Sequence, residues 1–404
     1  MNRFFLLLLP VLLALSPLPA QAQDTTLVRL LRTNAYPLTA KGAQLSGPGW
    51  NQLQASIAKS QFVLVGEQHG TAEVPQFTQA VAQVQQPVAF ITEIDRYQAR
   101  SLTALTAQPG FPTAYCKATP MALSFFSWTA EYELARQLRA QHTRLIGIDQ
   151  VSFLGVGRFY QELAGQVRIP PARTYLLRQG AGFQARNLAC YRSGAGGFSM
   201  FVQSAVSLDS LRTIAKAESP AVRHMVDDYL LSCRVYQGSG PNGAASHQQR
   251  VNLMKRNLLE ELRSLQAGGQ PLPKLLFKFG ANHMARAISP WSGITDVGNL
   301  ALNLADVQDA KSLHLLVMGR EGSQNNGFNP DDASKNVENY KLDDADFKPF
   351  VDLAPGPDWR VFDLRPARRA LLSGKLTLSN QALANLLLGY DYFVLVAATT
   401  ASHG

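Results

Sequence analysis

Residues 62–69 read Phe-Val-Leu-Val-Gly-Glu-Gln-His: four apolar residues, then a glycine, two polar residues and a histidine. A short apolar run that stops at a glycine is typical of a buried strand followed by a turn. The pattern recurs at residues 275–283, Leu-Leu-Phe-Lys-Phe-Gly-Ala-Asn-His, and a third apolar run, residues 88–92, stops at Glu93. Open α/β sheets bind ligands beyond the carboxyl ends of parallel strands. The three endings therefore predict one shared polar site, which is the layout of an enzyme.

Strand-like and helix-like segments alternate through the first 150 residues. Apolar residues recur at helical spacing over residues 74–85 and again over residues 131–141, and a strand-like run follows each segment. Alternation of this kind favours parallel strands joined by right-handed crossovers. We expect an α/β fold with a mostly parallel central sheet flanked by helices. The predicted strands are 61–66, 88–93, 144–149, 274–279, 312–318, 359–363 and 391–397.

Residues 155–245 interrupt the alternation. Glycine-rich joints, among them residues 194–197 and 238–240, separate stretches with helical periodicity. We expect this segment to be a helical insertion that forms a cap over the active edge of the sheet. The predicted helices are 157–166, 171–186, 199–218 and 220–235.

A long amphipathic helix is predicted over residues 246–267, where the apolar residues form one stripe. Ser246 and Gln249 match a capping box at its start, and two glycines follow its end. Residues 319–336 are rich in glycine, asparagine and aspartate, which predicts a mobile loop.

The first 22 residues have the organisation of a secretory signal peptide. Arg3 supplies a positive charge, residues 4–15 are apolar, and residues 20–22 form a small-residue cleavage site. The apolar run is shorter than the roughly 20 residues of a spanning helix, and no later run is long enough, so we expect no stable membrane insertion. Residues 23–404 are expected to form a single exported α/β domain, periplasmic or extracellular.

Composition excludes some classes of protein. With 46% hydrophobic and 17% charged residues in a chain of 404, the protein is globular rather than disordered. The formal net charge is +9, but the lysines and arginines are scattered, so no nucleic-acid partner is expected. Export permits a disulfide among Cys116, Cys190 and Cys233, and Cys190–Cys233 is the pair we predict. Without a Cys-x-x-Cys motif, a thiolate zinc site is not expected.

The histidines and glutamates at the strand ends are the candidate catalytic residues. His69 lies two residues after Glu67, and a nearby carboxylate raises the basicity of an imidazole, so His69 is a candidate general base for water. Together, His69, Glu93 and His283 also match the two-histidine, one-carboxylate set of hydrolytic metal sites, which would hold a divalent ion such as Mn, Co or Zn. Both alternatives, with and without a metal, stay open, as does a structural role for each residue.

Further candidates flank these residues. Arg250 and Asn257 lie seven residues apart on one side of the long helix, and an arginine there suits a carboxylate, a phosphate or a developing oxyanion. Glu73, which follows His69 in the same loop, is a second candidate substrate contact beside Asn257. The alternative is that Arg250 and Asn257 form the solvated edge of an amphipathic helix.

Two carboxylates end apolar strands and need partners, because burying an unpaired charge is costly. For Glu93 the alternative to catalysis is an ion pair with Arg96 or Arg250. Asp149 could serve the site or cap the following helix.

Several catalytic signatures are absent from the sequence. It contains no Gly-x-Ser-x-Gly elbow, no Walker phosphate loop, no dinucleotide-binding glycine motif after a strand and no His-Glu-x-x-His. A serine hydrolase or a nucleotide-dependent enzyme is therefore disfavoured.

The candidate residues resemble a known family. Residues 66–73, Gly-Glu-Gln-His-Gly-Thr-Ala-Glu, are similar to the Gly-Glu…His-Gly…Glu segment of erythromycin esterase-like proteins, and residues 250–257 resemble their Arg-Asp-x-x-Met-x-x-Asn helix. Residues 280–283 and 390–401 are similar to the family's later histidine-bearing strand end and last strand. The family's aspartate after the helix arginine is replaced here by Val251, and its additional histidine by Gly280, so cleavage of macrolide lactones is not expected.

The paired Gly-x-x-His segments are also similar to those of Tiki/TraB-type metal-dependent proteases and ChaN-like haem-binding proteins. The resemblance implies an α/β core in which His69 activates water with Glu93, His283 assists, and Arg250 contacts the substrate or oxyanion. We expect an exported hydrolase acting on an ester, lactone or amide in a small molecule or peptide. The alternatives are a haem- or metal-binding protein without turnover and a family member that has lost activity and serves a stabilising or interaction role.

Overall fold

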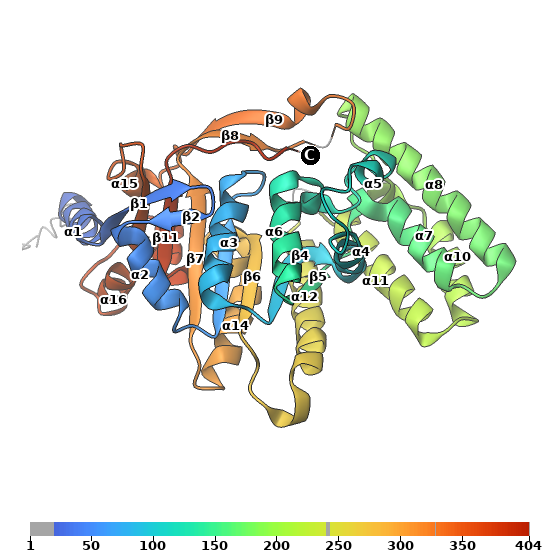
Figure 1. The fold of residues 1–404 in the computed structure, drawn as a ribbon, viewed down its shortest axis with the longest axis horizontal. Coiled ribbons are helices and arrows are strands. Elements are labelled where there is room, and N and C mark those ends of the chain that lie inside the picture. The colour runs from blue at the N-terminus through green and yellow to red at the C-terminus, as the bar shows by residue number, and fades with distance from the viewer. Residues whose placement is uncertain (1–19, 240–242, 328, 404) are drawn as a thin grey trace, which may run out of the picture.

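A nine-stranded sheet lies at the centre of the molecule, in the order β2-β1-β10-β11-β7-β3-β6-β4-β5 (Figure 1). This computed structural model describes residues 20–239, 243–327 and 329–403, so most of the predicted signal peptide lies outside the described residues. The strands are β1 (Ala35–Lys41), β2 (Gln44–Ser46), β3 (Phe62–Glu67), β4 (Ala89–Asp95), β5 (Arg144–Asp149), β6 (Leu275–Gly280), β7 (Ser312–Gly319), β10 (Trp359–Asp363) and β11 (Tyr392–Val396).

The α/β prediction is confirmed: the six strands from β11 to β5 are parallel, and the remaining three add an antiparallel edge. The main helices are α1 (Ala20–Thr33), α2 (Pro48–Ile57), α3 (Glu73–Gln85), α4 (Arg96–Leu105), α6 (Thr129–Ala140), α7 (Val156–Gln166), α8 (Pro170–Ser193), α10 (Ala205–Lys216), α11 (Pro220–Gln237), α12 (Ala244–Leu265), α14 (Val297–Asp306), α16 (Arg365–Leu372) and α17 (Gln381–Gly389). The short helices are η1 (Ser124–Ser127), α5 (Thr113–Ala118), α9 (Ser199–Val202), α13 (Ala281–Met284) and α15 (Lys348–Val351).

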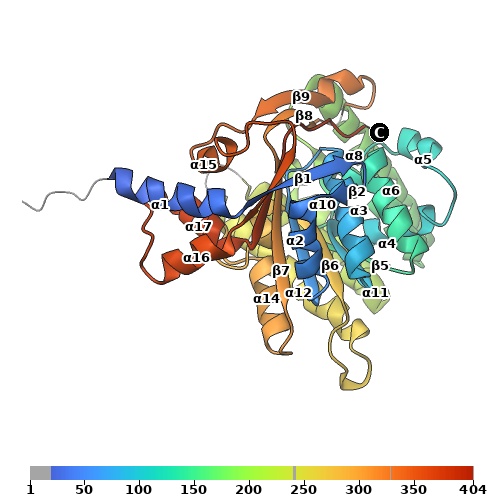
Figure 2. The ribbon, with the colours of Figure 1, turned by 60° about the vertical axis from the view of Figure 1, so that its left-hand side comes forward.

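Alternate residues of each central strand point into two separate cores, because successive side chains of a strand face opposite sides of the sheet. In β3, Phe62 and Leu64 pack with α1, α12, α14, α16 and α17, whereas Val63 and Val65 pack with α2, α3, α4 and α6. Both faces of the sheet are thus covered by helices, as Figure 2 shows. A strand buried on both faces is continuously apolar, which is why residues 62–65 could be recognised in the sequence.

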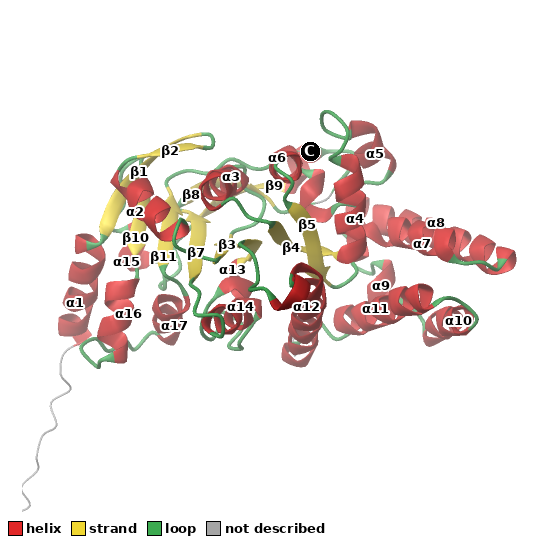
Figure 3. Cartoon of the chain, turned by 60° about the horizontal axis from the view of Figure 1, so that its bottom comes forward, coloured by secondary structure: helices red, strands yellow, loops and turns green. Residues whose placement is uncertain are grey.

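Helices α7 to α11 pack around a third hydrophobic core beyond the β5 end of the sheet (Figure 3). The single helix predicted over 199–218 is wrong, because Gln203 and Ser204 interrupt it. The Gln203 side chain donates to Tyr160 Oη at 3.3 Å and accepts from Tyr229 Oη at 2.6 Å, while Ser204 caps α10.

The predicted capping box of the long helix is also wrong. Helix α12 begins at Ala244, so Ser246 lies within its first turn, and its hydroxyl donates to the Val235 carbonyl at 2.5 Å. The helix ends at Leu265, before the two glycines.

The predicted mobile loop at 319–336 instead contains β8 (Glu321–Asn325), which pairs with β9 (Val337–Lys341). Figure 1 shows this hairpin crossing above the sheet towards α8. Strand β8 has no apolar pattern to reveal it; backbone pairing holds it, including Ser323 N–H to Thr399 O at 3.0 Å. An ion pair of 2.6 Å between Arg192 and Asp331 ties the hairpin loop to α8.

The predicted disulfide is wrong: Cys116, Cys190 and Cys233 are all free thiols. Cys190 on α8 faces the Gly196 carbonyl and Cys233 on α11 faces the side chain of Gln203, so the two sulfurs have separate partners. Within the described chain, no helix is both long and apolar enough to cross a bilayer.

A buried histidine makes the fold sensitive to acid. His314 on β7 is fully buried, with Nδ1 2.7 Å from the Met284 carbonyl and Nε2 3.0 Å from the Ser312 hydroxyl. Burial lowers its pKa to about 4, despite the charge of Asp391. The unfolded chain therefore binds a proton more readily than the folded chain, and stability is lost as the pH falls from about 6.5 towards 4.

We expect His314→Gln to remove this part of the acid sensitivity. Between pH 7 and pH 4.5 the wild type should lose about 2–3 kcal/mol more free energy of unfolding than the variant. Urea denaturation of both proteins at the two pH values measures this difference. Equal losses in the two proteins would mean that His314 does not cause the loss of stability at low pH.

Candidate active site

The carboxyl ends of β3, β4 and β6 meet at an open cavity of about 400 Å³. The structure brings His69, Glu93 and His283 together there, with Arg250 reaching in from α12. None of the described residues of the segment 155–245 lines this cavity. The lining residues are Glu67, Gln68, His69, Glu93, Arg250, Gly280, Ala281, Asn282, His283, Trp291 and Met318.

Glycines bring the two strand ends close enough to form a site. Gly70 has a φ of 80°, and a Cβ there would collide with the Asn325 carbonyl, so the turn after His69 requires glycine. A Cβ on Gly280 would lie 2.8 Å from His69 Nε2. The missing side chain at Gly280 lets the His69 ring lie against β6 and leaves the Gly280 N–H free to donate to Glu93 Oε2 at 2.7 Å.

His69 is held on three sides. Glu67 Oε1 accepts from Nδ1 at 2.8 Å, Nε2 lies 3.5 Å from Glu93 Oε2, and the ring stacks on Phe125 with centroids 4.3 Å apart. Burial would lower its pKa, but hydrogen bonds and charges from Glu67 and Glu93 outweigh burial and raise the pKa to about 10. About a third of the side chain (33%) stays exposed, and His69 lines the cavity.

Glu93 lies between the two imidazoles and uses both oxygens. Oε1 is 2.7 Å from Arg250 Nη2 and 3.4 Å from His283 Nε2, while Oε2 accepts from Gly280. Burial would raise its pKa, but His283, His69 and Arg250 hold the pKa well below the usual range. Of the two ion pairs considered for Glu93, the structure contains the one with Arg250.

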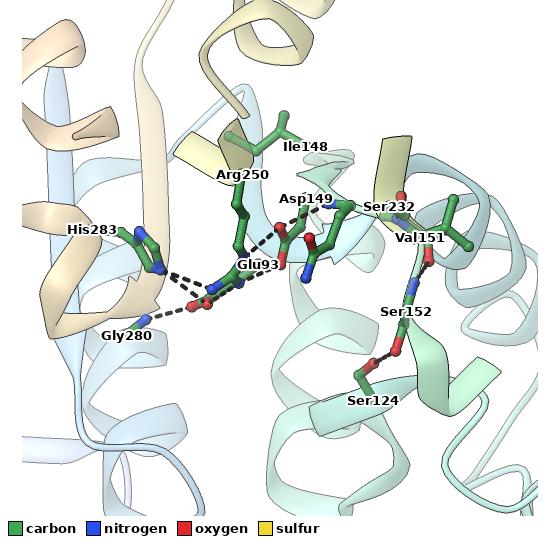
Figure 4. A network of polar contacts seen from close by, with 12 residues as sticks. Glu93, Ser124, Ile148, Asp149, Val151, Ser152, Ser232, Arg250, Gly280 and His283 are labelled. Atoms are coloured by element: carbon green, nitrogen blue, oxygen red, sulfur yellow. Dashed lines mark hydrogen bonds and ion pairs between the residues drawn. The ribbon is translucent and has the colours of Figure 1, made fainter. Parts of the chain in front are cut away.

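Arg250 is fixed by a bidentate pair with Asp149, at 3.0 Å to Oδ1 and 2.6 Å to Oδ2. Figure 4 shows its guanidinium between Asp149 and Glu93, with His283 on the far side. Its Nη1 lies 3.4 Å from His283 Nε2, and 22% of the side chain is exposed. Asp149 therefore orients the arginine, although it also accepts from the Gln150 N–H at 2.7 Å.

His283 is buried and oriented by an acid that the sequence analysis did not identify. Asp296 Oδ2 is 2.9 Å from His283 Nδ1, and Asp296 also caps α14. Burial would lower the pKa of His283, but Glu93 and Asp296 raise it to about 9. At neutral pH His283 is therefore an imidazolium facing Glu93.

Lys278 is a second residue that the sequence analysis missed. Its Nζ is 2.7 Å from Glu67 Oε1 and 2.6 Å from Glu131 Oε1, and the side chain is only 3% exposed. Burial raises the pKa of Glu131 to about 7, and its Oε2 has no hydrogen-bond partner in the part of the chain that the structure describes. Lys278 lowers the pKa of Glu67 against the effect of burial, so Glu67 stays ionised beside His69. Lys278 could have been identified from the sequence, because it is a lysine inside an otherwise apolar predicted strand.

The structure places the two predicted substrate contacts away from the cavity. Asn257 is buried, donates to the Ile148 carbonyl at 2.8 Å and accepts from Arg96 at 3.0 Å, so it joins α12 to the sheet. Glu73 accepts from the Thr400 N–H at 3.1 and 3.0 Å and holds the C-terminal segment. Neither residue lines the cavity, and both make hydrogen bonds within the chain, so their contact with substrate stays a prediction.

The predicted metal ligands do not fit a divalent ion in this arrangement. Arg250 and Gly280 occupy the oxygens of Glu93, and Arg250 also faces His283 Nε2. Among the residues that the structure describes, no group of three His, Cys, Asp or Glu is set to hold a metal ion.

Comparison with known proteins shows the fold. No family model and no curated protein matches the sequence. The structure is similar to erythromycin esterase EreC in its open conformation, with a TM-score of 0.58 and 12% identity over 91% of this chain and 98% of EreC. A succinoglycan biosynthesis protein matches with a TM-score of 0.58 and 13% identity, over 95% of this chain and 100% of that one. A Bacillus cereus protein matches with a TM-score of 0.56 and 15% identity, over 94% and 98% of the two chains.

The expected resemblance to erythromycin esterase-like proteins is thus confirmed at the level of the fold. ChaN of Campylobacter jejuni matches with a TM-score of 0.29, which is too low to carry an argument about this chain. At identities of 12–15%, these matches show that the chain shares the fold of erythromycin esterase EreC and nothing finer.

Proposed function

We propose that this protein is an exported hydrolase in which His69 activates water for attack on an ester, lactone or amide carbonyl. The observation that carries the proposal is the 2.8 Å hydrogen bond between Glu67 and His69 Nδ1, beside an open cavity. With Nδ1–H donating to the carboxylate, the neutral ring presents the lone pair of Nε2 to a water molecule. The export half of the proposal is supported by the signal-peptide pattern of residues 1–22.

The chemical steps follow from the charges around the cavity. Neutral His69 takes a proton from water, and the resulting hydroxide attacks the carbonyl carbon. The carbonyl oxygen becomes an oxyanion and accepts hydrogen bonds from Arg250 and from protonated His283. His69 then returns the proton to the leaving oxygen or nitrogen as the carbon–heteroatom bond breaks. Glu67 stabilises the imidazolium of His69, and Asp149 and Asp296 hold the two oxyanion donors in position.

The position of the Arg250 guanidinium supports an acyl substrate. Its guanidinium is anchored by two carboxylates yet keeps 22% of its side chain exposed at the cavity. A preorganised cation beside a general base supplies charge where a tetrahedral intermediate develops it. A binding protein without turnover has no need of both groups, so the enzyme is favoured over the haem- or metal-binding alternative.

The test is hydrolysis of a panel of p-nitrophenyl esters, aryl lactones and peptide amides by the purified protein. We expect turnover of at least one class, with loss in Glu67→Gln and no change in His224→Ala, which alters an exposed histidine outside the cavity. Inactivity across the whole panel, or a Soret shift on haemin titration without any turnover, would contradict the proposal.

The raised pKa values predict an alkaline pH optimum. The base His69, with a pKa of about 10, must lose its proton, while His283, with a pKa of about 9, must keep it. We expect kcat/KM to rise about tenfold per pH unit from pH 6 to pH 8.5, to peak between about pH 9 and 10, and to fall beyond. A pH–rate profile measures this directly, and a plateau reached by pH 7 would be inconsistent with the charge arrangement described here.

A further inference from the structure

A second cavity, of about 420 Å³, lies between α5, η1, the end of α8 and the β8–β9 hairpin. It shares no lining residue with the candidate active site. Its size is within the range of small-molecule sites. The mechanism proposed above uses none of its residues.

Apolar side chains form part of the cavity wall. Met121, Trp128 and Leu188 line the cavity from three different segments. Ser127 also lines it and is only 6% exposed, with its Oγ buried and without a hydrogen-bond partner among the described residues.

The cavity carries an excess positive charge. Lys117 lines it and is exposed, and no ion pair of Lys117 occurs among the described residues. The other cation in the wall, Arg192, is neutralised by Asp331 at 2.6 Å. A ligand with one acidic group would therefore complement Lys117, and the apolar walls would cover the rest of the molecule.

Hydrogen bonds within the chain fix the hairpin loop and the C-terminal segment that line the cavity. Asn329 Oδ1 accepts from the backbone N–H groups of Asp331 and Asp332, both at 3.0 Å, which shapes the hairpin loop. The His403 carbonyl accepts from the Thr129 N–H at 2.7 Å and fixes the C-terminal segment. A site built in advance loses little conformational entropy when a ligand binds.

We propose that this second cavity binds a flat apolar carboxylic acid, with its ring against Trp128 and Met121 and its carboxylate towards Lys117. The cavity is one aromatic layer from the candidate base, because Phe125 stacks on His69 and lies 5.8 Å from Trp128 between ring centroids. The site is nevertheless separate, and its occupancy does not depend on the hydrolase proposal.

A cysteine in the cavity wall allows ligand binding to be followed by chemical labelling. Cys116 lines it and is partly exposed, whereas Cys190 and Cys233 are buried. The proposed probe is 2-naphthoate, and the control ligand is 2-naphthamide, which has nearly the same shape but no charge. Titration calorimetry should show one 2-naphthoate site per chain with at least tenfold weaker binding of 2-naphthamide, and 2-naphthoate should slow iodoacetamide labelling of Cys116 at least fivefold by mass spectrometry.

Three variants separate this site from the first cavity. Lys117→Glu should weaken 2-naphthoate binding at least tenfold, whereas Lys216→Glu, the same charge change on an exposed residue of α10, should leave it unchanged. His69→Ala should also leave binding unchanged, since His69 does not line the second cavity. The proposal is overturned if Cys116 is not protected, or if binding survives Lys117→Glu but is lost in His69→Ala.

Discussion

Replacement of His69 by alanine is expected to lower kcat/KM by roughly a thousandfold or more, because general-base catalysis and orientation of the water are lost together. The loss should come mainly from kcat, since His69 acts on the water and not on the substrate's binding groups. The measurement is steady-state hydrolysis of the best substrate from the panel by wild type and His69→Ala, at the pH optimum of the wild type.

The matched control for His69→Ala is Glu67→Gln. The amide keeps the volume of the carboxylate, but it removes the charge that favours the imidazolium of His69. A smaller loss, about a hundredfold, is therefore expected, together with a shift of the rising limb of the pH–rate profile to lower pH. Thermal unfolding should confirm that both variants are folded. If His69→Ala retains more than a tenth of the wild-type kcat/KM, His69 is not the base.

Replacement of Lys278 by methionine is expected to be the most damaging single change to stability, about 3–5 kcal/mol in the free energy of unfolding. Lys278 is the cation between two carboxylates, and both Glu67 and Glu131 are buried. Removing one partner of a buried ion pair leaves an uncompensated charge, which is the costly case. Urea denaturation at pH 7 measures the loss, and a loss below 1 kcal/mol would contradict this account of the network.

The same variant has a catalytic signature that a merely structural role does not produce. Without Lys278, the pKa of Glu67 should rise, so a larger fraction of the protein has Glu67 protonated and donating to His69 Nδ1. The ring would then carry its own hydrogen on Nε2 and could not accept a proton from water. We expect kcat/KM of Lys278→Met to be about a hundredfold low at pH 7 and to recover part of the loss as Glu67 ionises at higher pH.

A double variant checks that the charges are the cause. Lys278→Met with Glu131→Gln leaves one buried carboxylate instead of two, so it should be more stable than Lys278→Met alone. Glu131→Gln by itself should have a small effect on stability, because burial already raises the pKa of this group to about 7. Additive losses in the double variant would show that the two residues do not act as a pair.

The parts of the site that could be predicted from the sequence are local. An apolar run and the glycine after it identify the end of each strand without knowledge of the rest of the chain, and this placed His69, Glu93 and His283 at one edge. Parallel pairing of neighbouring strands then brings those ends together, since Glu67 on β3 is in register with Gly280 on β6. Arg250 was found because an arginine at the edge of an apolar helical stripe could reach past the core.

The parts that could not be predicted depend on partners far along the chain. Glu73 and Asn257 were predicted to contact substrate from their neighbours in the sequence, which did not reveal that their polar atoms bond to Thr400 and to Ile148. The β8–β9 hairpin has almost no apolar residues, so no periodicity reveals it, and its partner segment lies at the end of the chain. The two cysteines predicted to pair lie in different helices, each facing a different acceptor.

Amino-acid order alone determined where the buried strands run and which titratable groups stand at their ends, because hydrophobic burial and the freedom of glycine act over a few residues. Only the folded structure determined the partners, the charge and the proton affinity of those groups. Lys278 meets Glu67 across 211 residues, and Asp149 takes hold of Arg250 across 101. Charges, hydrogen bonds and proton affinities depend on distances of a few ångströms between such partners, and those distances exist only after the chain has closed.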